Sequence, residues 1–130
     1  MSTYTQICYH IVFSTKNRQP VLTPARREDL FRYIWGIINN HEGHLYRING
    51  VEDHVHILCD LHPTVCLADL VKAIKTGSSK WIKENGVFPE FGHWQDGYGA
   101  FTQSPADKFV DEYRELLKRA GIEYDERYLL

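Results

Sequence analysis

The middle of the chain contains the stretch Gly50-Val-Glu-Asp-His54-Val-His56-Ile-Leu-Cys-Asp60. Acidic residues followed by an apolar run predict a turn that leads into a strand. Successive side chains of a strand point to opposite faces, so His54 and His56 are expected side by side on one face, about 7 Å apart. Two imidazoles on a rigid element suit one divalent metal ion, although many His-x-His pairs in strands bind none.

Outward from this stretch, the chain alternates between strand and helix patterns. The predicted elements are a strand at 4–14, a helix from Thr23-Pro24 to Glu42-Gly43, strands at 44–51 and 54–61, a helix at 65–85, a strand at 91–103 and a helix from Ser104 to about Ala120. The hydroxyl of Thr23 is expected to cap the first helix. The turn between the two middle strands lies at Asn49-Gly50 or at Glu52-Asp53.

This order of elements predicts an α+β fold, a ferredoxin-like βαββαβ sandwich with an antiparallel sheet and an extra C-terminal helix. In that topology the first and third strands are central. The histidine pair would then lie in mid-sheet, beside the strand that holds His10. His10 is interpreted as a packed strand residue rather than a ligand.

The length of 130 residues favours a single domain over residues 1–130. A hydrophobic content of 43% and a charged content of 25% are those of an ordinary globular protein. The sequence contains neither an apolar run of about 18–20 residues nor a signal peptide, so no membrane association is expected. Cys8, Cys59 and Cys66 form neither an even set nor a Cys-x-x-Cys pair, which favours a reducing, cytoplasmic location.

The net charge of −2 excludes a uniformly basic surface but allows a local basic face. Such a face is suggested by Lys16, Arg18, Lys72, Lys75, Lys80 and Lys83, four of which lie on one predicted helix. These cations either follow a phosphate backbone or form the solvated side of an amphipathic helix. Phe91, Trp94 and Tyr98 either stack on unpaired bases or pack, and packing is expected for at least two of them.

Five segments carry a resemblance to a known family. They are Tyr9-His-Ile-Val-Phe-Ser-Thr-Lys-Asn-Arg18, Gly50-Val-Glu-Asp-His-Val-His-Ile-Leu58, Lys75-Thr-Gly-Ser-Ser-Lys-Trp-Ile-Lys83, Trp94-Gln-Asp-Gly-Tyr-Gly-Ala-Phe-Thr102 and Gly121-Ile-Glu-Tyr-Asp-Glu-Arg-Tyr-Leu129. With these segments in this order, the chain resembles the single-tyrosine HUH transposases of the insertion-sequence 200 type, often called TnpA. HUH denotes a histidine-hydrophobe-histidine motif.

The resemblance implies an enzyme that cuts and rejoins single-stranded or hairpin DNA. A tyrosine hydroxyl would attack a phosphodiester and leave a 5′-phosphotyrosine, with Mg²⁺ or Mn²⁺ bound by His54 and His56. The resemblance also implies a homodimer whose subunits share active sites. The covalent link conserves the energy of the bond, and the sequence accordingly has no glycine-lysine loop for a nucleotide triphosphate.

The nucleophile is where the chain departs from the family, whose tyrosine is followed four residues later by a glutamine that binds the metal. Counting forward from Ser104 makes Tyr113 the nucleophile, with Leu117 in place of that glutamine. Counting backward from Tyr128 matches more residues and implies that the tyrosine helix is missing.

On the backward count, the chain is either a remnant that binds DNA without cutting it or a sequence that has lost a stretch. The third metal ligand stays open between Asp53, Gln103 and a phosphate oxygen. An unrelated ferredoxin-like ligand or metal-binding module is the remaining alternative for the function.

Overall fold

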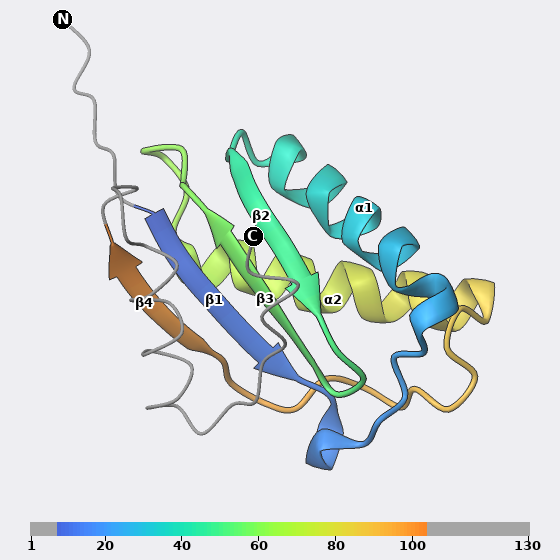
Figure 1. The fold of residues 1–130 in the computed structure, drawn as a ribbon. Helices are drawn as coiled ribbons and strands as arrows, with labels where there is room; N and C mark the ends of the chain where they lie inside the picture. The colour runs from blue at the N-terminus through green and yellow to red at the C-terminus, as the bar shows by residue number, and fades with distance from the viewer. Residues whose placement is uncertain (1–7, 104–130) are drawn as a thin grey trace, which may run out of the picture.

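The computed structural model describes residues 8–103, and Figure 1 shows their arrangement. The elements are β1 (Cys8–Ser14), the short 3-10 helix η1 (Lys16–Arg18), α1 (Pro24–Asn40), β2 (Leu45–Gly50), β3 (His54–Cys59), α2 (Leu67–Asn85) and β4 (Gly99–Gln103). This is the predicted βαββαβ order. The predicted strand residues 4–7 and the predicted C-terminal helix, which contains Tyr113, lie outside the described residues.

The four strands form one antiparallel sheet in the order β2-β3-β1-β4. The first and third strands are central, as predicted, so the histidine pair lies in mid-sheet. In the register of β1 and β3, Val12 pairs with His56 and Ser14 pairs with His54. The α+β, ferredoxin-like prediction is confirmed.

Both helices cover the same face of the sheet (Figure 1). The core between the helices and the sheet contains Ile11, Phe13, Val55 and Ile57 from the central strands, with Leu30, Ile34, Ile38, Leu70, Ile74 and Ile82 from the helices. Because strand side chains alternate, the residues between these core positions, His10, Val12, His54 and His56, point to the other face. The sheet therefore has an apolar helix side and a histidine side.

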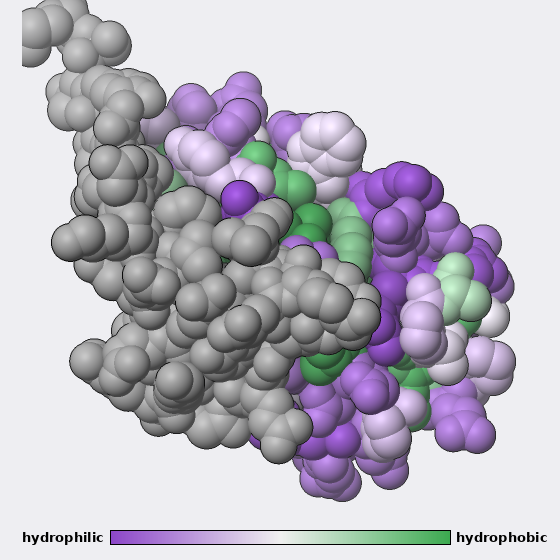
Figure 2. All heavy atoms as spheres, viewed as in Figure 1, coloured by the Kyte–Doolittle hydropathy of each residue, from purple (hydrophilic) through white to green (hydrophobic). Residues whose placement is uncertain are grey.

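The ends of the helices differ in detail from the predictions. Pro24 opens α1 as expected, but the Thr23 hydroxyl makes no capping hydrogen bond within the described part of the chain. The second helix begins at Leu67 rather than at residue 65, and it ends before Gly86, which adopts a left-handed φ of 58°. Neither described helix is long and apolar enough to cross a membrane. Figure 2 shows mainly hydrophilic residues on the outer surface near α1.

The turn between β2 and β3 lies after Gly50, so Glu52-Asp53 rather than Asn49-Gly50 forms it. Backbone hydrogen bonds tie this turn to the segment after β1. The amide of Thr15 donates to the carbonyl of Asp53 at 2.9 Å, and the amide of Leu22 donates to the carbonyl of Glu52 at 2.9 Å. The turn is therefore held by these long-range contacts together with one local bond, from the amide of Val51 to the carbonyl of His54 at 3.0 Å.

The prediction of a strand at 91–103 is wrong for its first part, because β4 begins only at Gly99. Residues before it make a single bridge, between Trp94 and Thr15. Trp94 is 4% exposed and donates from Nε1 to the Ser78 hydroxyl at 3.0 Å, which folds the segment onto α2. Gly97, with a φ of 82°, allows the chain to turn back into β4.

Two glycines give a matched test of the hairpin. A Cβ on Gly50 would lie 2.6 Å from the carbonyl oxygen of His54, whereas a Cβ on Gly36 in α1 would have no described atom within 4 Å apart from its chain neighbours and the backbone of its own helix. We expect Gly50→Ala to lower the free energy of unfolding by about 1–3 kcal/mol, because the backbone must shift. We expect Gly36→Ala to raise it by about 0.5–1 kcal/mol. Urea denaturation measures both, and equal stability of Gly50→Ala and the unaltered chain would contradict the hairpin geometry.

Candidate metal centre and nucleic-acid interface

The two predicted ligands, His54 and His56, lie together on the face of the sheet that the helices leave uncovered. Their ring centres are 6.1 Å apart, and their ring planes are tilted by 38°. A metal–nitrogen bond of about 2.1 Å puts a ring centre roughly 3.2 Å from the ion, so two rings that bind one ion at an angle of about 90–110° have centres roughly 4.5–5.2 Å apart. The two rings would therefore move closer by roughly 1 Å or more on binding one ion.

Asp53 holds His54 from behind. Its Oδ1 lies 2.8 Å from Nδ1 of His54, and its Oδ2 accepts a hydrogen bond from Nε of Arg18 at 3.3 Å. A proton on Nδ1 that donates to the carboxylate leaves the lone pair on Nε2. That atom is buried and has no hydrogen-bond partner among residues 8–103. A histidine oriented by a carboxylate through one nitrogen, with the other available, is the usual arrangement of a metal ligand.

The turn that carries Arg18 has an unusual backbone. Asn17 and Arg18 have φ angles of 55° and 54°, a left-handed conformation that is uncommon for residues other than glycine. The side chain of Gln95 stabilises this turn, because its Oε1 accepts a hydrogen bond from the Asn17 amide at 3.0 Å. The strained turn brings the Arg18 guanidinium to Asp53.

Burial keeps both imidazoles neutral. It is the main cause that lowers the pKa of His56 to about 3, and charge repulsion from the nearby His54 and His10 contributes to the same shift. Burial also lowers the pKa of His54, although the carboxylate of Asp53 opposes this effect. Neutral imidazoles are the form that binds metal ions, so both side chains have the required protonation state at pH 7.

The third histidine, His10, is fully buried on β1, as expected for a packed strand residue. Among residues 8–103, no cluster of three or more His, Cys, Asp or Glu side chains is arranged to bind a metal ion. Asp53, one of the suggested third ligands, is instead bound to the back of His54. The described part of the site therefore offers two nitrogen ligands, and hard ions such as Mg²⁺ and Mn²⁺ would need additional oxygen ligands.

Three of the predicted DNA-contacting lysines line one groove, which has a volume of about 490 Å³ and runs along α2. Its lining residues are Lys75, Thr76, Ser79, Lys80, Lys83, His93, Trp94 and Asp96. Lys16 lies close to this groove, because its amide donates to the carbonyl of His93 at 3.0 Å. The exposed Lys72 lies outside the lining, on the same helix.

Lys75 differs from the other lysines. Its Nζ donates to the carbonyl of Gln95 at 2.6 Å and to that of Gly97 at 2.7 Å, and burial lowers its pKa. It thus joins α2 to the segment before β4. The sequence did not reveal this role, because a lysine on an amphipathic helix is usually solvated. The link from Arg18 through Asp53 to His54 was also missed, and its one sequence signal is the acidic residue directly before the histidine.

The three candidate stacking aromatics have different environments. Phe91 is 7% exposed and Trp94 is 4% exposed, and their rings pack edge to face with centres 5.0 Å apart. Tyr98, in contrast, is 42% exposed. The expectation that at least two of the three pack in the core is confirmed, and Tyr98 alone of this group remains available for stacking on a base.

The family model for IS200-like transposases matches residues 3–115 of the sequence. This chain belongs to that family. Transposases of this family are generally metal-dependent, which agrees with a histidine pair on a central strand. The match includes Tyr113 without testing its role. A comparison with curated proteins gives no match.

Two solved structures share the fold of this IS200-like transposase. One, a candidate transposase from Deinococcus radiodurans R1, has a TM-score of 0.72 and 21% identity, over 95% of this chain and 98% of the other. The second is a REP-associated tyrosine transposase bound to a REP hairpin, with a TM-score of 0.61 and 14% identity, over 93% of this chain and 74% of the other. At these identities the two structures support the fold and not the roles of single residues.

The low pKa of His56 predicts how stability depends on pH. Between its ordinary pKa of 6.5 and about 3, the unfolded chain binds a proton that the folded protein does not bind. The free energy of unfolding should therefore decrease as the pH falls, by up to about 1.4 kcal/mol per pH unit for this group. His56→Asn should have a shallower slope between pH 6.5 and 4.5. Urea denaturation in the presence of a chelator measures it, and identical slopes would contradict the burial of His56.

Proposed function

We propose that this transposase cuts and rejoins single-stranded DNA ends through a 5′-phosphotyrosine, with Mg²⁺ or Mn²⁺ bound by His54 and His56. The observation that carries the proposal is the buried Nε2 of His54, which Asp53 orients from behind and which lies beside His56 on a central strand. Ordered imidazoles of this kind are built to bind a cation.

The bound ion would polarise the scissile phosphate and stabilise charge on the leaving oxygen. Tyr113 is the proposed nucleophile, although it lies outside the described residues. Its phenolic oxygen forms a bond to phosphorus while the bond to the 3′-oxygen breaks. The phenol loses its proton and the 3′-oxygen gains one, so the products are a 5′-phosphotyrosine and a 3′-hydroxyl. Rejoining is the reverse reaction with a different 3′-hydroxyl.

The six predicted DNA contacts remain part of the proposal, with different expected contributions. Lys80 and Lys83 line the α2 groove and are exposed, so they are the strongest candidates for phosphate contacts. Lys16 and Lys72 lie near or beside that groove and would extend it. Lys75 and Arg18 already bind groups within the protein, so they would act on DNA mainly by positioning other residues.

The proposed partner is single-stranded or hairpin DNA, and the proposed assembly is a homodimer with shared active sites. One structural neighbour is a tyrosine transposase bound to a REP hairpin, which supports a hairpin as the form of DNA to test first. A reducing, cytoplasmic location fits the three free thiols in the structure, Cys8, Cys59 and Cys66.

The reaction can be tested with labelled hairpin oligonucleotides taken from the DNA that flanks the coding sequence. With Mn²⁺, we expect a covalent protein–DNA adduct that survives phenol extraction and maps to Tyr113 by mass spectrometry. Tyr113→Phe and His54→Ala should each abolish the adduct and keep salt-sensitive binding. The absence of adducts on every tyrosine of the unaltered chain would overturn the proposed cleavage.

A DNA-hairpin binder without catalytic activity is the second candidate. It is favoured by one observation, that Leu117 stands where the family has its metal-binding glutamine after the tyrosine. This candidate predicts hairpin binding by the unaltered chain without cleavage. It also predicts equal hairpin affinity for the unaltered chain and for Tyr113→Phe.

Asp53 provides a test of the metal centre that does not depend on cleavage. We expect Asp53→Ala to weaken Mn²⁺ binding by about 10- to 100-fold, because His54 loses the carboxylate that orients it. Glu52→Ala is the matched control, since the side chain of this neighbouring carboxylate is 60% exposed and lies 3.9 Å from Arg27. It acts on His54 through its charge and makes no hydrogen bond to that ring among residues 8–103. Isothermal titration calorimetry measures both affinities. Equal losses in the two variants would contradict the orienting role of Asp53.

A further inference from the structure

A second hollow lies beside His54 and is used by none of the steps above. It has a volume of about 250 Å³, and its lining residues are Val12, Phe13, Ser14, Arg18, His54, Gln95, Asp96, Gly97, Tyr98 and Gly99. Phe13 belongs to the helix side of the sheet and His54 to the histidine side. The pocket therefore opens where the central strands meet the segment before β4. We call it the β4-entry pocket.

The chemistry of this pocket suits a neutral ring better than a phosphate. The one cationic side chain in its lining, Arg18, is already paired with Asp53, and Asp96 adds a negative charge. Phe13 and Val12 give it an apolar floor, because both are almost fully buried. Tyr98 supplies an exposed aromatic face at its rim, and Gly97 and Gly99 add no side chains there.

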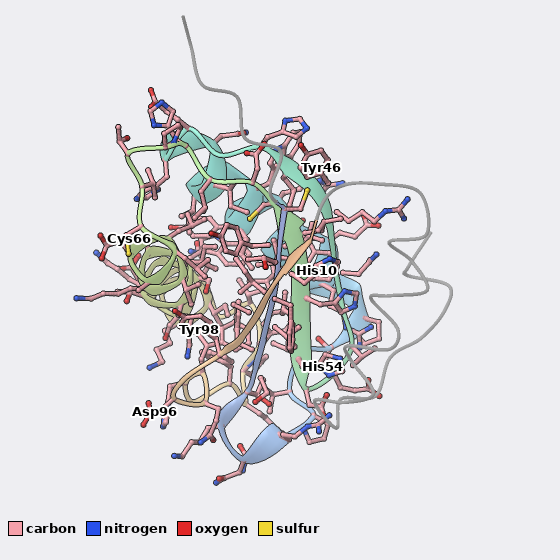
Figure 3. The ribbon with its side chains drawn as sticks, turned by 90° about the vertical axis from the view of Figure 1, so that its left-hand side faces the viewer. His10, Tyr46, His54, Cys66, Asp96 and Tyr98 are labelled. Carbon is pink, nitrogen blue, oxygen red and sulfur yellow. The ribbon has the colours of Figure 1, made fainter. Side chains whose placement is uncertain are left out.

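The α2 groove has the opposite character, with three lysines and one carboxylate in its lining. Asp96 lines both hollows, so they lie on two sides of the same segment. Figure 3, viewed from the β4 side, shows Asp96 and Tyr98 towards α2 and His54 towards the opposite face. A DNA strand whose backbone lies along the α2 groove would thus pass Tyr98 before one of its phosphates reaches His54 and His56.

The wall that contains Tyr98 is braced from two directions. Lys75 binds the carbonyls of Gln95 and Gly97 from α2, and the Gln95 side chain binds the amide of Asn17. A preformed wall lowers the entropic cost of holding a ligand in one geometry. The pocket volume of about 250 Å³ is below the range of about 300–1,000 Å³ that is typical of pockets for drug-sized ligands, so the pocket suits a smaller group such as one base.

We infer that the β4-entry pocket binds one unpaired nucleobase of the DNA strand, stacked on Tyr98, next to the phosphate at His54 and His56. The inference rests on the proposed function and adds a base-binding subsite to it. Stacking on an aromatic ring is tolerant of base identity. At the edge of the base, the carboxylate of Asp96 can accept hydrogen bonds and the side-chain NH2 of Gln95 can donate them.

Two probes separate base binding from backbone binding. One is fluorescein-labelled dT12, and the other is a labelled strand of twelve abasic sugar-phosphates with the same charge. Fluorescence anisotropy should show that Tyr98→Ala weakens dT12 binding by about 5- to 100-fold and leaves the abasic strand unchanged. Tyr98→Phe, which keeps the ring, should stay within about twofold of the unaltered chain. Lys80→Ala combined with Lys83→Ala should weaken both probes alike and reduce the salt dependence.

The outcomes distinguish the pocket from the function on which it rests. Equal affinity of the unaltered chain for dT12 and for the abasic strand overturns the base pocket and leaves DNA binding intact. Failure of both probes to bind at low salt overturns the pocket and the proposed function together. A measurement on the unaltered protein covers the case in which a Tyr98 variant misfolds. A 5-iodouracil in the labelled strand should photocrosslink to Tyr98, and crosslinks found only elsewhere would contradict the assignment.

Discussion

Asp53 joins the backbone of the sheet to the geometry of the histidines. Its carbonyl accepts hydrogen bonds from the amide of Thr15 at 2.9 Å and from the Thr15 hydroxyl at 3.2 Å. Its carboxylate contacts His54 on one oxygen and Arg18 on the other. The backbone of Asp53 thus holds the end of β1 next to the turn, and its carboxylate holds the ring of His54 in one orientation. A change in the turn would move the backbone register and the imidazole together.

The two faces of the sheet have different physical requirements. The helix side buries aliphatic side chains, which stabilises the fold through the hydrophobic effect. The histidine side buries His10, His54 and His56, whose charged forms are costly away from water. Keeping His54 and His56 neutral reduces that cost, and a neutral imidazole is also the form that binds a cation. At low pH the free energy of unfolding is therefore lower than it would be if apolar side chains occupied this face.

The segment from His93 to Tyr98 separates the α2 groove from the β4-entry pocket in this chain. Its bonds to Lys75 and Asn17 hold it between α2 and the turn after β1. On one side lie lysines suited to phosphates, and on the other lies an apolar pocket with Tyr98 at its rim. In proteins that bind single strands, a positively charged groove follows the backbone and aromatic rings stack on the bases, so the two hollows match the two parts of the proposed ligand.

The sequence by itself determined the order of the elements, the central position of β1 and β3 and the shared face of His54 and His56. The order of the elements and the shared face follow from local periodicity and from the alternation of strand side chains, which depend on neighbouring residues alone. The central position of the two strands follows from the topology that this order predicts. It also pointed to the transposase family, through motifs spread along the chain. It left open the position of the turn at Glu52-Asp53 and extended the last strand too far towards Phe91.

Only the tertiary structure decided which groups the charged side chains bind. Arg18 and Lys75, interpreted from the sequence as DNA contacts, bind Asp53 and the backbone of Gln95 and Gly97. The indole of Trp94 packs against α2, where Ser78, sixteen residues earlier, accepts a buried hydrogen bond from it. Such partners lie far apart along the chain, and no local pattern encodes a distance that is set by the packing of helices on a sheet.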